Sequence, residues 1–417
     1  MTPVNWPTYS GYKESGVEWI GSVPATWSVE RGKWLFVKKD RPTRLVDEVV
    51  TCFRDGQVTL RRNRRTDGFT NAMKEHGYQG IRKGDLVIHA MDAFAGAIGV
   101  SDSDGKATPV YSACVPRQPD TVDPHFYAYY MRHLALSGLL VSLAKGIRER
   151  STDFRYGDFA DLELVAPPLS EQRAISAFLD EKCAKVDEAV RIKEEQIALL
   201  RERRQILIQQ AVTRGLNPDV PMKDSGIDWI GEIPAHWHRR KIRHLFEIGR
   251  GRVIPREELV EGGKYPVFSS QTKNEGVFGY LDTFDFDTDQ LTWTTDGANA
   301  GSVFRRRGRH NCTNVCGTLR PKSPEVDLGF CAHAVGHAAI FYKRPDTNGA
   351  KIMNEEMAAI EFPLPPFEEQ LALAHRIDTQ IREIENAVSI KESQICALGE
   401  YKTTLINAAV TGKIKVA

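Results

Sequence analysis

The chain contains an internal repeat, and this repeat limits the possible folds more than any other feature of the sequence. Residues 12–36 and 222–246 are identical at 11 of 25 positions. Residues 162–215 and 360–413 are identical at 21 of 54 positions and follow in the same order. Collinear matches of this kind indicate a duplication, so we expect two similar halves.

The segments between the repeated blocks do not match. Residues 37–110 and 247–314 show no convincing identity, although they occupy corresponding places in the two halves. One chain therefore carries two similar frames around two unlike inserts. Unlike inserts favour a recognition protein, because a pure scaffold has no need of two different domains.

The composition sets further limits. The 417 residues include 56 basic and 55 acidic side chains, which excludes a uniformly basic binder and makes any attraction to DNA local. The longest apolar stretch, Ala135–Ala144, is too short to span a bilayer, and residues 1–14 lack the pattern of a signal peptide. Seven cysteines, an odd number, indicate free thiols. We expect a cytoplasmic protein with no membrane partner.

A long helix is predicted after each Pro-Pro-x-x-Glu-Gln motif. The proline pair suits a helix start, and Glu171 and Glu369 fall in the first turn, where negative charge is favourable. Apolar residues then recur at alternating spacings of four and three, which predicts a coiled-coil seam. The predicted seam comprises Leu179, Val186, Val190, Ile197, Leu200 and Leu207 in the first helix and Ile377, Ile384, Val388, Ile395, Leu398 and Leu405 in the second.

Four charged residues interrupt this seam. Lys193 and Arg204 lie in the first helix, and Lys391 and Lys402 lie at equivalent positions in the second. Polar residues at seam positions can fix register and partner number at a cost in stability. Alternatively, these side chains extend from the edge of the seam into solvent. The sequence leaves both readings open.

The connection between the halves decides how the helices pair. Only about ten residues separate Gly215 from Ser225, which already belongs to the second frame. Such a link spans at most ~35 Å, whereas a helix of ~40 residues is ~60 Å long. We therefore expect an α+β fold in which two globular α/β domains are separated by two long antiparallel coiled-coil helices with an approximate dyad, a symmetry that matches duplex DNA. The predicted domains are residues 1–161, 162–215, 216–359 and 360–417.

The repeated motifs resemble those of the specificity subunits of type I restriction-modification systems. They are YKESGVEWIGSVPATW (residues 12–27), APPLSEQ (166–172), AVTRGLNPDVPMKDSGIDWIGEIPAHW (211–237) and PLPPFEEQ (363–370). The resemblance covers nearly the whole chain. It implies two target-recognition domains that alternate with two helical regions, in a non-catalytic subunit that binds an asymmetric bipartite sequence in double-stranded DNA.

The same resemblance implies the partners and cofactors. Two methyltransferase subunits would bind this chain, and restriction/translocase subunits would join them for cleavage. S-adenosylmethionine, and ATP with Mg for restriction, would be bound by these partners and no cofactor by this chain. The sequence agrees with a non-catalytic role, because it contains neither an Asn/Asp-Pro-Pro-Tyr/Phe methylase motif nor a Walker A loop.

Arginine clusters are the candidate DNA contacts of the first domain, because phosphate contacts need Lys or Arg. The densest cluster consists of Arg61, Arg62, Asn63, Arg64 and Arg65. A second cluster contains Arg148 and Arg150. The alternative is that these residues form a solvated face or contact an acidic surface of a partner.

The second domain offers both arginines and short polar side chains. Arg305, Arg306 and Arg307 follow a strand-like segment and are predicted at a hairpin tip, and Arg250 and Arg252 flank Gly251 in another loop. Short polar side chains in turns can read base edges in the major groove, although ordinary turn chemistry would also explain them. The base-reading candidates are Gln271, Thr272, Lys273, Asn274 and Asn299.

A set of histidines and cysteines in the second half has spacing that resembles a zinc site. The set is His310, Cys312, Cys316, Cys331, His333 and His337. However, Tyr127 and Tyr129 occupy the positions in the first half that correspond to Cys331 and His333. The frame therefore does not require ligands there, and we predict no metal site.

Two other functions remain open from the sequence. The chain could be the specificity module of a related restriction system with a different motor or nuclease arrangement. It could also be a protein scaffold whose coiled coil organises partners without reading DNA.

Overall fold

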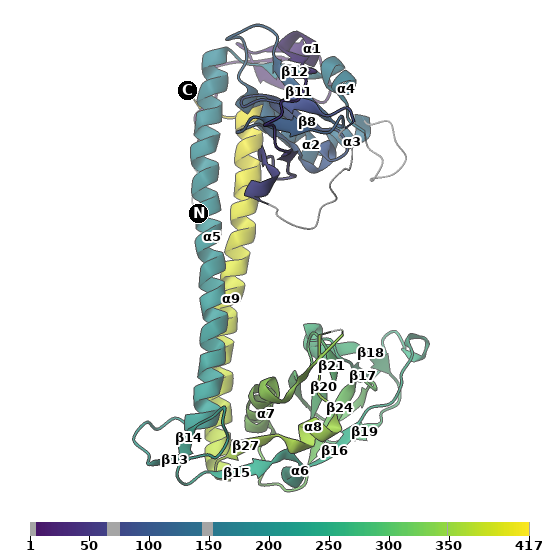
Figure 1. Ribbon diagram of the computed structural model, residues 1–417, viewed down its shortest axis with the longest axis vertical. Helices are drawn as coiled ribbons and strands as arrows, with labels where there is room; N and C mark the ends of the chain where they lie inside the picture. Colours follow the sequence, from purple (N-terminus) through teal and green to yellow (C-terminus); the bar gives the residue numbers. More distant parts are fainter. Residues whose placement is uncertain (1–5, 65–75, 144–152, 348, 417) are drawn as a thin grey trace. The chain divides into compact units, whose positions relative to one another are not determined.

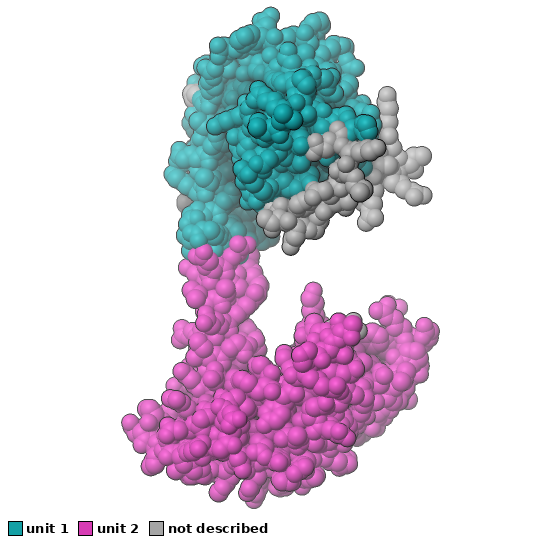
Figure 2. Space-filling view, viewed as in Figure 1, with its two compact units in different colours: residues 1–192, 393–417 teal, residues 193–392 magenta. Residues whose placement is uncertain are grey.

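The computed structural model describes residues 6–64, 76–143, 153–347 and 349–416. It divides into two compact units, residues 1–192 with 393–417 (unit 1) and residues 193–392 (unit 2), which are coloured separately in Figure 2. Each unit combines one globular region with a segment of both long helices. The compact units therefore divide the helices, whereas the predicted domains divide the chain at the helix ends.

The two long helices contribute to both units. They are α5 (Leu169–Arg214) and α9 (Phe367–Val410). The remaining elements of unit 1 are β1 (Tyr12–Glu14), β2 (Ser22–Pro24), β3 (Ser28–Arg31), α1 (Gly32–Leu35), β4 (Phe36–Lys38), β5 (Val50–Cys52), β6 (Val58–Leu60), η1 (Arg61–Asn63), β7 (Gln79–Ile81), β8 (Leu86–His89), η2 (Ala93–Ala95), β9 (Ile98–Val100), β10 (Gly105–Ala107), β11 (Tyr111–Pro116), α2 (Pro124–Leu136), α3 (Leu139–Leu143), α4 (Tyr156–Asp161) and β12 (Glu163–Ala166).

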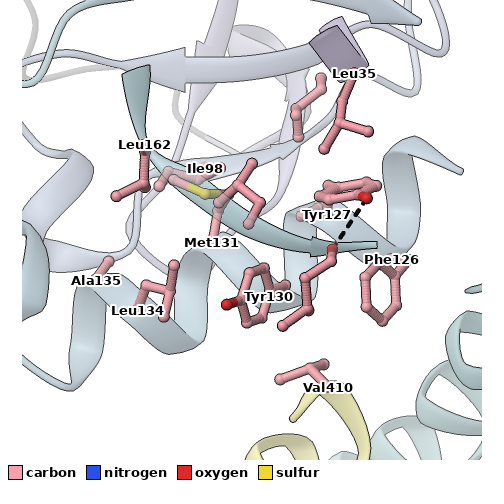
Figure 3. Close-up of a cluster of buried hydrophobic side chains, with 14 of the residues drawn as sticks. Leu35, Ile98, Phe126, Tyr127, Tyr130, Met131, Leu134, Ala135, Leu162 and Val410 are labelled. Carbon is pink, nitrogen blue, oxygen red and sulfur yellow. Dashed lines mark hydrogen bonds between the residues drawn. The ribbon is translucent and has the colours of Figure 1, made fainter. Parts of the chain in front are cut away.

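An antiparallel four-stranded sheet lies at the centre of unit 1, in the order β4-β11-β8-β9. Helix α2 packs against it, and Figure 3 shows Phe126, Tyr127 and Met131 of α2 in the same buried cluster as Ile98 of β9. The Tyr127 hydroxyl donates a hydrogen bond to the Val165 carbonyl oxygen (3.1 Å). The end of α9 joins this core as well, so unit 1 is built from both ends of the chain.

The globular region of unit 2 begins after the link that follows α5. Its elements are β13 (Met222–Asp224), β14 (Glu232–Pro234), β15 (His238–Lys241), α6 (Ile242–Leu245), β16 (Phe246–Arg250), η3 (Arg256–Glu258), β17 (Tyr265–Phe268), η4 (Lys273–Gly276), β18 (Val277–Leu281), β19 (Phe286–Asp287), β20 (Gln290–Thr294), β21 (Asp296–Gly297), β22 (Val303–Arg306), β23 (Arg309–Cys312), β24 (Cys316–Pro321), α7 (Leu328–Tyr342), β25 (Arg344–Asp346), β26 (Gly349–Lys351), α8 (Asn354–Ala359) and β27 (Glu361–Leu364).

The two units share one design even where their sequences differ. The sheet β16-β24-β20-β22 of unit 2 has the same antiparallel order as β4-β11-β8-β9, and hairpin β13-β14 corresponds to β1-β2. The pair β15-β27 likewise corresponds to β3-β12. Unit 2 adds a second four-stranded sheet, β18-β17-β23-β19. The unlike inserts therefore share a central sheet and differ in what is attached to it.

Helices α5 and α9 lie side by side and run antiparallel (Figure 1). In unit 2, Gln196 contacts Lys391 and Arg204 contacts Glu385, so residue numbers fall along α9 as they rise along α5. The twelve predicted seam residues are all buried or half-buried. The predicted fold, with long antiparallel helices and α/β globular regions, is confirmed.

Three of the four charged seam residues reach across to the other helix. Lys402 Nζ lies 2.6 Å from an Asp187 carboxylate oxygen in unit 1, and Lys391 Nζ donates to Gln196 Oε1 (2.7 Å) in unit 2. Arg204 lies 3.7 Å from Glu385. These contacts favour a role in setting register over simple extension into solvent.

The Glu-Gln pair at the start of each long helix ties that helix to its globular region. The buried indole of Trp27 donates to Glu171 (3.1 Å), and that of Trp237 donates to Glu369 (3.0 Å). A carboxylate in the first turn is already favoured by the helix dipole, and here it also satisfies a buried tryptophan N–H. Each repeated tryptophan is thus fixed against a repeated glutamate.

The glutamine of the pair makes a second connection. Gln172 and Gln370 are buried, and each donates to the carbonyl oxygen of the first proline in its Pro-Pro pair (2.8 and 3.0 Å). Each also accepts a hydrogen bond from the backbone N–H of the N-cap residue of a domain helix, Asp123 of α2 (2.8 Å) and Asp327 of α7 (2.9 Å). One side chain therefore joins the starts of two helices in each unit.

Candidate nucleic-acid interface

The predicted arginine cluster of the first domain lies on η1 and the residue that follows it. Arg62 Nη1 lies 2.6 Å from Glu48 Oε1, and Arg64 Nη1 lies 2.6 Å from Asp55 Oδ2. The two arginine side chains are still 65% and 37% exposed. Exposed ion pairs are weak, so a phosphate can replace either carboxylate at little cost.

The other members of this cluster are held by hydroxyl groups. Arg61 Nε donates to Thr51 Oγ1 (3.3 Å), and Asn63 Nδ2 donates to Thr59 Oγ1 (2.8 Å). Both bonds tie η1 to the β5-β6 hairpin, so the arginines are presented on a fixed support. Three other predicted contacts, Arg65, Arg148 and Arg150, lie outside the described residues.

Arg250 and Arg252 differ in their surroundings. Arg250 ends β16, is exposed and donates to the Asn314 carbonyl oxygen. Arg252 lies between two carboxylates, 2.9 Å from Glu258 and 3.2 Å from Asp285. The hydrogen bond to Glu258, and then the charges of both carboxylates, raise the pKa of Arg252. Arg250 is therefore the better candidate for a phosphate contact.

The segment Arg305–Arg307 is not the tip of a hairpin. Strand β22 ends at Arg306 and pairs with β20, whereas β23 pairs with β17 and β19 of the other sheet. The predicted tip is therefore a crossing between two sheets. Arg305 is exposed and lies 3.7 Å from Asp289, and Arg307 is exposed with no hydrogen bond or ion pair in the described part of the chain.

Arg306 departs most clearly from the prediction of a DNA contact. The residue is only 3% exposed, because its side chain points between the two sheets rather than outward. Its guanidinium lies over the rings of Phe268 (3.6 Å) and Phe304 (4.6 Å). A phosphate cannot reach a side chain in this position, so Arg306 is removed from the set of direct contacts.

The base-reading candidates of unit 2 occupy loops at strand ends. Residues 271–274 are all exposed in the connection between β17 and β18, and Gln271 Nε2 donates to the Val277 carbonyl oxygen. Asn299 is exposed between β21 and β22, and its backbone carbonyl accepts from Ser302 N (3.0 Å). Arg306 lies close to this loop although it is distant in sequence. Its Nη1 donates a hydrogen bond to the carbonyl oxygen of Glu275, the residue that follows Asn274 (2.6 Å).

The histidines and cysteines of the second half do not assemble into a metal centre. The described residues contain no group of three or more His, Cys, Asp or Glu that could hold a metal ion. The His310 nitrogens face the Gly308 carbonyl (2.8 Å) and Gln290 Nε2 (2.9 Å), and His337 packs on Trp229. The six residues are thus divided among β23, β24 of the other sheet, and α7.

Sequence reasoning missed the residues that fix the globular regions to the helices. The Tyr129 hydroxyl donates to Asp180 (2.8 Å), and His333 Nε2 lies 2.8 Å from Asp378 at the equivalent place in unit 2. The repeat offset would have revealed the two aspartates, because both are identical in the alignment of the long helices. It could not reveal that a tyrosine and a histidine make the same contact.

Comparisons with known proteins place this architecture in one group. A family model described as the type I restriction modification DNA specificity domain matches residues 234–392. The N-terminal part of a putative type I specificity subunit from Mycoplasma pneumoniae is 38% identical over 140 residues, which are 33% of this chain and 75% of that protein. The specificity subunit of the MpnII type I restriction enzyme from the same organism is 33% identical over 135 residues, 32% of this chain and 41% of that protein.

Solved structures agree on the fold. A chain from a study of complex assembly and conformational transition in a type I R-M system aligns with a TM-score of 0.71 at 14% identity, covering 93% of this chain and 98% of that chain. The HsdS subunit from Thermoanaerobacter tengcongensis aligns with a TM-score of 0.55 at 15% identity, covering 96% and 100%. No helix within the described ranges is long and apolar enough to cross a membrane. The chain belongs to the specificity-subunit family of type I restriction-modification systems.

Proposed function

We propose that this chain reads an asymmetric bipartite sequence in double-stranded DNA, one part with each globular region, and has no catalytic activity of its own. The observation that carries the proposal is that two units with the same central sheet present different polar loops. A shared sheet with different loops is what two different base sequences require, because base edges are read by side chains on projecting elements.

We also propose that the chain recruits two methyltransferase subunits and, for cleavage, restriction/translocase subunits. S-adenosylmethionine, ATP and Mg would be bound by those partners. The helix pair of unit 2 supports a partner-binding role, because Leu199 and Ile390 are 63% and 58% exposed. The contact of Arg204 with Glu385 sets a register in which residues 199 and 390 lie at about the same level along the pair. Ile206, 46% exposed, lies about two turns further along the same side of α5 as Leu199.

The DNA-reading role is tested by sequencing methylated bases in source cells with and without this gene. We expect deletion to abolish methylation at one asymmetric bipartite motif, because the specificity subunit directs the methyltransferase subunits. An unchanged methylome would contradict the proposal, and the lost motif would give the target sequence.

The partner-binding role is tested by charge substitution on the exposed apolar surface. We expect L199E and I390E together to reduce co-purification of the methyltransferase subunit at least tenfold, because two buried apolar side chains are worth roughly 1.5–3 kcal/mol each. Q205E, which changes an exposed residue about 120° around the α5 axis from Leu199, is the matched control. Equal recovery of the methyltransferase subunit with both variants would exclude this surface.

A further inference from the structure

Arg306 is a buried cation without an acidic partner. It is 3% exposed, and no carboxylate lies within ion-pair distance of it among the described residues. Burial lowers the pKa of Arg306 to about 10. Burial of a charge is costly unless hydrogen bonds or ring faces offset it, so the position of this residue requires an explanation.

The side chain is held by two rings and two oxygen atoms. Its guanidinium lies 3.6 Å from the ring centre of Phe268 and 4.6 Å from that of Phe304, where a cation is attracted to the ring face. Nε donates to Thr292 Oγ1 (2.9 Å), and Nη1 donates to the Glu275 carbonyl oxygen (2.6 Å). The bond to Thr292 fixes the arginine to the central sheet, and the bond to Glu275 extends that support to a loop.

This loop, residues 269–276, has a backbone that is difficult to maintain. Asn274, Glu275 and Gly276 are consecutive residues with φ values of 49°, 50° and 81°, in the left-handed region. Such a conformation is unfavourable for a residue with a side chain and persists only when its surroundings impose it. The loop is closed at its base by Ser269 N, which donates to the Gly276 carbonyl oxygen (3.0 Å), and Arg306 holds the carbonyl of the strained residue itself.

Gly276 completes the arrangement. A Cβ at this position would lie 3.0 Å from Nη2 of Arg306 and equally close to the Gln271 carbonyl oxygen. The remaining Nη2 of Arg306 has no hydrogen-bond partner in the described part of the chain, so the guanidinium is positioned by packing on that side. The arginine therefore packs closely against Gly276, where a larger residue would approach its guanidinium.

The outer side of the loop carries the candidate base-reading groups. The predicted base-reading residues Gln271, Thr272, Lys273 and Asn274 are all exposed, and their amide, hydroxyl and ammonium groups are the types that contact base edges. We propose that Arg306 is a positioning residue that holds loop 269–276 in the conformation in which these side chains read one part of the DNA target. The proposal rests on the function proposed above.

The test compares R306M with wild type in the complex with the methyltransferase subunits. Methionine keeps much of the apolar volume and removes the charge and donors. We expect preference at one or two base pairs in one half of the target to fall about tenfold or more, with the other half read normally. The slope of the logarithm of the DNA association constant against the logarithm of salt concentration should not change, because Arg306 does not contact phosphate.

Controls separate positioning from other roles. R320M removes an exposed arginine of β24 that pairs with Glu247, and it should leave both halves of the motif unchanged. If R306M fails to assemble, G276A provides the same readout, because it retains the arginine side chain and strains the loop at a residue with a φ of 81°. R306K should restore part of the preference, because lysine retains the positive charge and N–H donors on a single nitrogen.

Each outcome has a distinct meaning. A wild-type complex that shows no bipartite motif would defeat the proposed function itself. A wild-type motif that R306M and G276A both leave unchanged, or a uniform loss of methylation at all sequences, would overturn only the role of Arg306. A smaller salt slope in R306M would show that this arginine contacts DNA directly.

Discussion

At the scale of single residues, the short polar side chains that join elements are more informative than the arginines. Gln370 is 1% exposed and satisfies the Asp327 N–H and a proline carbonyl, and Gln172 does the same in unit 1. The same buried hydrogen bond therefore joins the long helix to the domain helix in both units. The loss of either glutamine leaves two backbone groups without partners.

We therefore expect Q370A to destabilise unit 2 by roughly 2–6 kcal/mol, since each of the two buried polar groups left unsatisfied costs about 1–3 kcal/mol. The effect should appear as faster amide hydrogen exchange along α7 and a lower thermal midpoint. Q205A, at an exposed position of α5, is the matched control and should change neither. Protection of α7 equal to that of wild type would show that the glutamine is dispensable.

The pair His333–Asp378 predicts that the stability of unit 2 depends on pH. The hydrogen bond from His333 lowers the pKa of Asp378, so the carboxylate stabilises the folded state above its unfolded pKa and loses this effect as the pH falls through its lowered folded value. We expect D378N to lower the thermal midpoint near neutral pH, and the difference from wild type to narrow below about pH 4. A difference that is constant with pH would contradict this assignment. D180N is the control in unit 1. It replaces the carboxylate that accepts a hydrogen bond from Tyr129, at the position that corresponds to Asp378.

At the scale of elements, the sequence predicted the long helices of the repeated blocks. It did not predict the matching central sheets of the segments that do not repeat. Both long helices follow from the Pro-Pro-x-x-Glu-Gln start and the seam spacing, because these patterns are local. The central sheets β4-β11-β8-β9 and β16-β24-β20-β22 could not be predicted as equivalent, because short strands of different sequence can satisfy the same pairing.

The candidate site was predicted less well, for a physical reason. A run of arginines reveals charge but not which side of a strand each residue occupies. Successive side chains of a strand point to opposite faces, and in β22 this exposes Arg305 and buries Arg306. The left-handed backbone at Asn274 and Glu275 could not be predicted from the sequence either. The contact to it comes from Arg306, about thirty positions later in the chain.

At the scale of the whole molecule, each compact unit is a globular region completed by both long helices. The core of unit 1 contains Trp27 from the start of the chain and Val410 from its end, and Lys415 N donates to the Pro7 carbonyl oxygen (2.6 Å). Unit 2, in contrast, is one continuous segment, residues 193–392.

This difference has a consequence for biosynthesis. A ribosome delivers residues in chain order, and domains generally fold as units once their residues have emerged. Unit 2 has all its residues as soon as position 392 is free, whereas unit 1 waits for residues 393–416 to cover its core. The globular region of unit 1 is therefore translated first but completes its folding last. Its core stays partly exposed until the C-terminal turns of α9 have been synthesised.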